Sequence, residues 1–167
     1  YAPGSYPHMV ADQTNRQQGT AIQSVHYRGE APMWLDVASG QLQIAVGSFQ
    51  AFNAVATRGV RAIGVTGSYR SPKLPDVPTL TEQGNTEKLV TLEGGLPLVA
   101  PAGTPEAILK RMADEAVAWS NTDKAAKLRE TFAIPNKPKN LADTRKDWEG
   151  EVPVWIKLAV DLGIKLD

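Results

Sequence analysis

The chain has 167 residues, of which 42% are hydrophobic and 22% charged, and its 18 basic residues balance its 18 acidic ones. This composition is ordinary for a soluble globular protein with enough apolar material to form a core. The basic residues are scattered, so the electrostatic footprint of a nucleic-acid-binding protein is missing, and the lack of cysteine excludes disulfides, thiolate metal sites and a cysteine nucleophile.

The first residues, from Tyr1 to Ser5, carry neither a basic nor an apolar leader region, and no apolar run approaches the roughly 20 residues of a membrane span. We therefore expect a soluble chain that, as given, has no export signal. His8 and His26 lack the acidic partner pattern of a metal site, so we expect them at the surface or in a helix cap.

The opening turn of the chain is a candidate anion site. Gly4, Ser5, Tyr6 and His8 lie at the start of a polar stretch that is predicted to be helical through Gln18. If Ser5 or Tyr6 caps this helix, its first backbone N–H groups and its dipole favour a bound carboxylate. The alternative is an ordinary capped helix without a ligand, because serine and glycine commonly precede helices.

Strand and helix patterns alternate over the next forty or so residues. Short, partly β-branched runs predict strands at residues 20–27, 42–46 and 60–65, and the intervening segments 31–39 and 50–58 predict helices. Gly40 and Gly59 are placed to end those helices. Strands alternating with helices indicate an α/β fold with a mainly parallel sheet.

Gly47 and Ser48 form a second candidate binding position, because they follow the strand predicted at residues 42–46. In open parallel sheets, ligands bind beyond the carboxyl ends of the strands. A tight turn without a ligand is the alternative.

Three prolines, Pro72, Pro75 and Pro78, change the character of the chain between Tyr69 and Gly84. Proline fixes φ and removes a backbone donor, so this stretch is predicted to be an extended surface segment.

A strand is predicted at residues 96–100, followed by a helix with Thr104 as N-cap, Pro105 at its first position and an end near Trp119. A further helix is predicted over residues 123–131. The apolar positions of the first helix are expected to form a core face: Ile108, Leu109, Met112, Ala116 and Trp119.

The last segment, residues 143–162, has the apolar periodicity of an amphipathic helix, and its tryptophans Trp148 and Trp155 are expected to pack in a core. An exposed aromatic surface for a partner is the alternative. Pro153 removes a helical hydrogen bond at a cost of about 3 kcal/mol, so we expect a kink or break near residues 149–151.

The motifs of common catalysts are missing from the sequence: the GxSxG elbow, the phosphate-binding GxxxxGK loop, HExxH and the dinucleotide-binding GxGxxG. Asp12, Asp36 and Asp76 lie in separate segments, so a pair of catalytic carboxylates is not indicated. We predict no catalytic residue, no metal ligand and no cofactor.

Several motifs resemble those of the Bug or TctC family, the periplasmic solute-binding receptors of tripartite tricarboxylate transporters. The most specific are the RSPKLPDVPT segment and the APAGTP segment. The resemblance covers essentially the whole chain and rests on residues 4–8, 25–32, 39–43, 57–67, 70–79, 100–105 and 155–166.

The resemblance implies a type II periplasmic binding protein fold, in which a small carboxylate is enclosed between two α/β domains. Residues 1–93 would be domain two, and residues 94–167 the mainly helical C-terminal part of domain one. The family's motifs lie in the second half of a longer chain, so the sequence is identified as the C-terminal part of a receptor, with half of the cleft.

The ligand contacts implied by the resemblance are Ser5, Tyr6, His8 and Ser48, with Gly4 and Gly47 beside them. The sequence departs from the family pattern at four places: Gly47 stands where aspartate is common, and the others are Gln43, His26 and residues 95–97. An acidic partner for a ligand amine or hydroxyl is thereby lost.

Two functional hypotheses follow, and an enzyme is not one of them. The first is a periplasmic receptor, or a fragment of one, that delivers a small carboxylate to the membrane subunits of a transporter. The second is a half-receptor module without ligand binding of its own, which associates with a second copy or with the missing N-terminal half.

Overall fold

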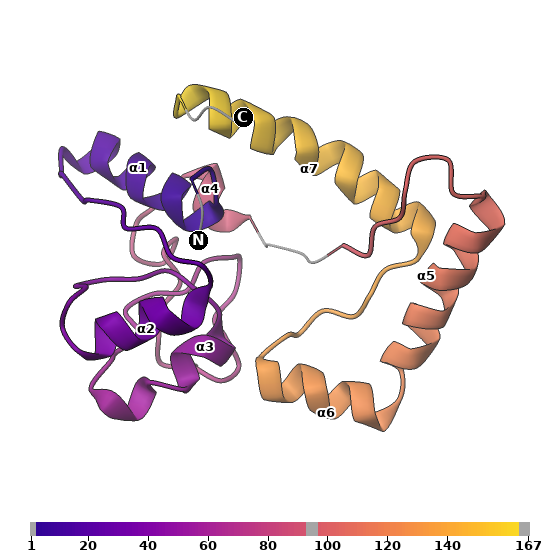
Figure 1. Cartoon of the computed structure of the whole chain (residues 1–167), viewed down its shortest axis with the longest axis horizontal. Coiled ribbons are helices and arrows are strands. Elements are labelled where there is room, and N and C mark those ends of the chain that lie inside the picture. The colour runs from indigo at the N-terminus through magenta and orange to yellow at the C-terminus, as the bar shows by residue number, and fades with distance from the viewer. Residues whose placement is uncertain (1–2, 93–96, 164–167) are drawn as a thin grey trace. The chain divides into compact units, whose positions relative to one another are not determined.

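The computed structural model describes residues 3–92 and 97–163 (Figure 1). The chain divides into two compact units. Unit 1 comprises Tyr1–Glu93 together with Ile156–Asp167, and unit 2 comprises Gly94–Trp155. Whether these units correspond to the two domains of a receptor stays a prediction, and the boundary at 93/94 lies outside the described residues.

Unit 1 contains the helices α1 (Tyr6–Gln18), α2 (Glu30–Ala38), α3 (Phe49–Asn53) and α4 (Lys88–Thr91), with a 3₁₀ turn η1 (Ala56–Arg58). The helices predicted at residues 31–39 and 50–58 are thus confirmed, the second as α3 and η1 in succession. Gly40 and Gly59 follow them with φ of 80° and 83°, a left-handed conformation that favours glycine.

The core of unit 1 lies under α2, where Met33, Trp34 and Val55 are buried and the ring of Phe52 meets the Trp34 indole edge-on. Partly buried apolar side chains from residues 27, 42, 45 and 60 pack against this cluster. The core therefore connects α2 and α3 with the segments that were predicted to be strands.

The predicted strands are not formed as a regular sheet in the described part of the chain, so these expectations were wrong in detail. The single pairing there is a parallel bridge between Val65 and Thr79, flanked by bonds from Val65 N–H to Pro78 O and from Leu80 N–H to Val65 O. Leu96 lies outside the described residues, and residues 97–100 carry no strand. Alternation of side chains predicts a strand's faces, whereas its ladder also requires a neighbour in register.

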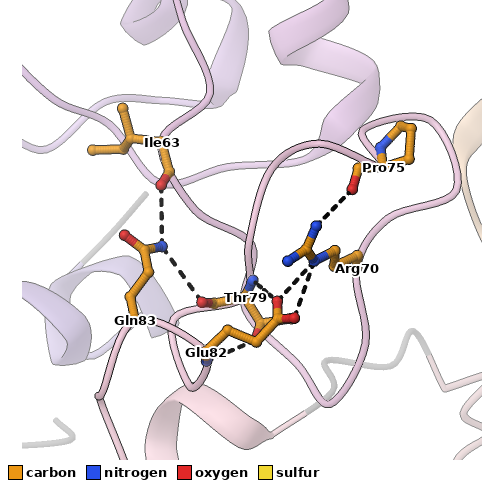
Figure 2. A network of polar contacts seen from close by, with 6 residues as sticks. All are labelled: Ile63, Arg70, Pro75, Thr79, Glu82 and Gln83. Atoms are coloured by element: carbon orange, nitrogen blue, oxygen red, sulfur yellow. Dashed lines mark hydrogen bonds and ion pairs between the residues drawn. The ribbon is translucent and has the colours of Figure 1, made fainter.

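The proline-rich segment is fixed by a polar network centred on Glu82 (Figure 2). The Glu82 carboxylate accepts from Thr79 N–H at 2.7 Å and from Arg70 Nε at 2.9 Å, and Glu82 N–H donates to the Thr79 hydroxyl at 3.0 Å. This is the reciprocal bonding of a capping box, here closing a turn. Arg70 also donates to Pro75 O, so its guanidinium joins the two ends of the loop between Arg70 and Glu82 and also holds the loop's interior.

Unit 2 contains α5 (Glu106–Ser120), α6 (Asp123–Phe132) and the first part of α7 (Leu141–Asp161). The predicted helices are confirmed, but Thr104 is not the N-cap of α5. Its hydroxyl donates to Pro101 O at 2.8 Å and closes the preceding turn, and Pro105 takes the cap position.

The predicted core face of α5 is largely uncovered, since Ile108, Met112 and Trp119 are 50%, 40% and 50% exposed. Among the described residues of unit 2, Ala125 is the buried apolar residue. Helical periodicity thus identified an apolar face without identifying what covers it.

The last helix, α7, continues through Pro153, so the predicted break is wrong, whereas the alternative of a kink stays a prediction. Pro153 and Glu149, whose carbonyl would lose its helical donor, are both exposed, and water can satisfy that carbonyl. Trp148 is 56% exposed, contrary to its predicted burial, whereas Trp155 is half-buried. In unit 1, Arg16 donates to the carbonyls of Asp161 and Leu162 and so caps the end of α7.

The helices in the described part of the chain are too short or too polar to cross a lipid bilayer.

The Glu82 network predicts a pH dependence of stability. The hydrogen bond from Arg70, and next the Thr79 N–H, lower the pKa of Glu82 from about 4.5 to about 2. A carboxyl whose pKa is lower in the folded state stabilises the fold above its unfolded pKa, and the contribution is lost as the pH falls from about 4.5 towards about 2. Urea midpoints measured between about pH 6 and pH 3 should therefore fall less steeply for Glu82→Gln than for the native chain.

Glu115→Gln is the matched control, because Glu115 is an exposed carboxylate paired with Arg111 at 3.2 Å on α5. Parallel pH profiles for the native chain and Glu82→Gln would contradict a folded-state role for the Glu82 carboxylate.

Candidate functional site

The first candidate site lies at the start of α1. Ser5 is the N-cap, and the first helical bond runs from Met9 N–H to Ser5 O. The preceding N–H positions have no helical acceptor, and Pro7 removes one of them. No acidic side chain lies in the first turn, so the positive end of the helix dipole is not offset there by a local carboxylate.

The Ser5 hydroxyl is the most unusual atom of this turn. Ser5 makes no side-chain capping bond, and its Oγ is the buried side-chain polar atom without a hydrogen-bond partner in the described part of the chain. Leaving a buried hydroxyl unpaired costs about 1–3 kcal/mol. The hydroxyl is therefore available to a bound ligand or water.

His8 fixes the turn that precedes the helix. Its Nδ1 accepts from Gly4 N–H at 2.9 Å, and its Nε2 lies 3.6 Å from the Asp12 carboxylate. Since Nδ1 is an acceptor here, the proton of the neutral ring lies on Nε2, on the side of Asp12. The edge of the ring meets His26, with centroids 5.1 Å apart. His8 thus orders the Gly4–Ser5 backbone.

The Tyr6 side chain has a structural contact, because its hydroxyl donates to Leu89 O at 3.2 Å and joins α1 to α4. Burial raises the pKa of the Tyr6 phenol above its ordinary value, and a hydrogen bond with Thr66 lowers it in part. The direct ligand contact predicted for Tyr6 stays a prediction.

A cavity of about 170 Å³ lies along α1 and begins at Ser5 and His8. Its walls come from one face of α1 and from the segments around residues 22–26 and 42–46. The lining is mainly aliphatic, and the described residues that form it include no lysine, arginine, aspartate or glutamate. The cavity can therefore accommodate an apolar group next to the polar turn at the start of α1.

The second candidate site, at Gly47 and Ser48, is engaged by a side chain of the protein. Glu30 Oε2 accepts from Ser48 N–H and from the Ser48 hydroxyl, both at 2.8 Å, and from Trp34 Nε1 at 3.4 Å. The Ser48 hydroxyl in turn caps α3 by accepting from Ala51 N–H at 3.3 Å. Sequence reasoning missed Glu30, which directly precedes the helix predicted at residues 31–39 and is the first residue of α2.

The structure brings part of the predicted set together. Ser5 and His8 line the cavity, which extends to Val46, the residue before Gly47. Gly4, Tyr6, Gly47 and Ser48 lie in the same unit but are not among the lining residues. Within the described ranges, no three histidine, aspartate or glutamate side chains gather where they could hold a metal ion.

The comparisons with known proteins agree on one family. The model of the tripartite tricarboxylate transporter family receptor matches residues 2–143. A UPF0065 protein from the tcbD-tcbE intergenic region of Pseudomonas sp. (strain P51) is 31% identical over 165 residues, which are 95% of this chain and 47% of that protein. Protein BugT of Bordetella pertussis is 27% identical over 159 residues, covering 90% of this chain and 48% of that protein.

The chain thus spans about half the length of these two curated relatives. A third relative, the UPF0065 protein from the clcB-clcD intergenic region of Pseudomonas knackmussii, matches at 27% identity over 94% of this chain and 93% of its own length.

A solved structure shows the fold. The periplasmic binding protein BugD aligns with a TM-score of 0.74 and 21% identity, over 95% of this chain and 54% of that chain. The predicted periplasmic-binding-protein fold is therefore confirmed, although the individual strands are not formed as predicted. Because the family model matches most of the sequence, from residue 2 to residue 143, the chain belongs to the receptor family of tripartite tricarboxylate transporters.

Proposed function

We propose that this chain is the ligand-binding part of a periplasmic receptor that takes up a small carboxylate and delivers it to the membrane subunits of a tripartite tricarboxylate transporter. Membership of the receptor family supports the general role. The observation that carries the carboxylate is the buried, unpartnered Ser5 hydroxyl at the start of α1.

A carboxylate at this position would receive three favourable interactions. The Ser5 hydroxyl would donate to it, the backbone N–H groups of the first turn would point at it, and the dipole of the 13-residue helix α1 would attract its charge. Hydrogen bonds to a charged group stabilise by about 1.5–3 kcal/mol each. The bond between Gly4 N–H and His8 would hold the turn in place before binding.

In the whole receptor, the proposed mechanism is enclosure of the ligand between two domains that close about a hinge. The ligand shifts the population towards the closed state by as much as it binds that state more tightly. This chain supplies one side of that cleft in the proposal.

Binding should raise the stability of the chain by RT ln(1 + [L]/Kd), which is about 2.7 kcal/mol at a ligand concentration of about a hundred times Kd. In a panel of small carboxylates, each compared with its neutral amide, the carboxylates that bind should therefore raise the melting temperature and their amides should not. Equal shifts with acids and amides, or no shift with any acid, would contradict the proposal.

Ser5→Ala should change stability and affinity in opposite directions. The ligand-free variant should be as stable as the native chain or more stable by about 1 kcal/mol, because the hydroxyl it removes is buried without a partner. Its affinity for a bound carboxylate should fall about tenfold or more.

Thr122→Ala is the matched control, since the Thr122 hydroxyl caps α6 by accepting from Ala125 N–H at 3.2 Å. That variant should lose about 1 kcal/mol of stability and keep its affinity. A Ser5→Ala variant that is destabilised as much as the control would show that Ser5 acts as an ordinary cap.

A second candidate function, a half-receptor module that associates with another chain, is favoured by the exposed apolar side chains of unit 2. Eight large apolar residues there are between 37% and 73% exposed: Leu98, Val99, Ile108, Met112, Trp119, Leu128, Ile134 and Trp148. Exposed apolar surface on this scale drives association.

Light scattering over a tenfold concentration range tests this candidate. A module of this kind should have a mass above the monomer, and Trp119→Glu should lower the mass, whereas Val25→Glu, at a 56% exposed site in unit 1, should not. A native chain that stays monomeric throughout would exclude self-association.

A further inference from the structure

The Gly47–Ser48 loop offers two donors to an anion, and an internal carboxylate already accepts from both. Ser48 N–H and the Ser48 hydroxyl each lie 2.8 Å from Glu30 Oε2. The indole N–H of Trp34, a residue of the buried core, donates to the same oxygen at 3.4 Å. Glu30 is therefore held in place from both sides.

Gly47 is the residue that makes room for this carboxylate. A Cβ at position 47 would lie 2.9 Å from Glu30 Oε2 and 3.1 Å from Trp34 Nε1. Contacts this close would displace the Glu30 side chain or the indole. Glycine at position 47 therefore leaves the space that the Glu30 carboxylate occupies.

This loop adjoins the cavity along α1. Val46 lines the cavity and directly precedes Gly47, and Met33 lines it one helical turn after Glu30 on α2. A ligand in the cavity that carried a second carboxylate towards the loop would meet a negative charge and donors already in use. Like charges brought together at a binding site cost affinity.

Among the described residues that line it, the cavity itself offers a second carboxylate no lysine or arginine partner, and its polar lining beyond the α1 turn is limited to Thr14, Gln23, Ser24 and His26. Its body is formed by aliphatic side chains such as Val10, Ala11, Ile22 and Ile44. An ionised carboxylate without a partner is strongly disfavoured in such surroundings. An apolar group is favoured there, and the 170 Å³ is similar to the roughly 150 Å³ cavity that accepts benzene in an engineered protein.

We propose that the site selects a monocarboxylate with a compact apolar body, such as a single ring or a branched chain, and that Glu30 is the residue that excludes dicarboxylates. This inference rests on the proposed function, because it assumes that a carboxylate binds at the start of α1. The single carboxylate would contact Ser5, and the apolar body would fill the cavity.

Isothermal titration of the full chain with benzoate and with succinate tests the selection. Benzoate should bind at least about tenfold more tightly than succinate. In Glu30→Gln, which keeps the shape of the side chain and removes its charge, succinate should gain severalfold and the ratio should fall, while benzoate should stay the tighter ligand because the aliphatic walls still disfavour a second carboxylate. Glu115→Gln, which removes one exposed carboxylate from α5, should keep the native ratio.

A second variant tests the cavity without touching Glu30. Ala11→Leu fills the space beside α1 with a residue that favours helix, and it should weaken benzoate about tenfold while the chain remains folded. Gln17→Leu, at an exposed position of the same helix, is its control and should bind benzoate normally.

The outcomes separate the two levels of the proposal. Succinate binding as tightly as benzoate, or a ratio unchanged by Glu30→Gln, would overturn the selection and leave carboxylate binding intact. Normal benzoate binding by Ala11→Leu would overturn the placement of the apolar body. A native chain that binds neither acid would overturn the proposed function, and the selection with it.

Discussion

The contact between Glu30 and Ser48 connects α2, α3 and the buried core of unit 1. One carboxylate oxygen accepts from the N-cap of α3, from its hydroxyl and from the indole of Trp34, so it joins the start of α2 to the start of α3 and to the core. It requires that position 47 carry no side chain. Because one oxygen serves all these donors, the geometry of the loop, the position of the indole and the position of the Glu30 charge are set together.

The two candidate anion positions, at Ser5 and at Ser48, differ in whether their hydroxyl groups already have hydrogen-bond partners within the protein. At Ser48, the backbone N–H and the hydroxyl share an internal acceptor, although the residue is exposed. At Ser5, the hydroxyl is buried without one. An unpaired group lowers stability, and a ligand that pairs it recovers that free energy on binding. In the proposed site, this asymmetry favours one anchoring point for a carboxylate over two, which is the physical argument for proposing a ligand with a single acid group.

Local rules in the sequence predicted the helices and several of their ends, because these depend mainly on neighbouring residues, although the N-cap of α5 is Pro105 in place of Thr104. Gly40 and Gly59 end their helices as expected, since left-handed backbone suits glycine regardless of distant contacts. Non-local features were less accessible. A strand forms a ladder only if a partner strand lies in register. Whether the helix continues through Pro153 depends on the exposure of the carbonyl that loses its donor. The Glu30 carboxylate accepts from a loop 18 residues further along the chain. The family motif RSPKLPDVPT was informative about identity, whereas its roles in this chain are structural, as the bonds of Arg70 and Thr79 to Glu82 show.

The two units differ in how much apolar surface they bury on their own. The cavity, the α1 turn and the Glu30 contact are all made within unit 1, which also holds the cluster of Met33, Trp34 and Val55. Unit 2 presents amphipathic helices with almost no buried apolar residue among those described. Since apolar burial is the main favourable term in folding, unit 2 would gain most from a partner that covers its helices. The proposed ligand site at α1 and the proposed association surface of unit 2 are therefore built from different residues of the chain.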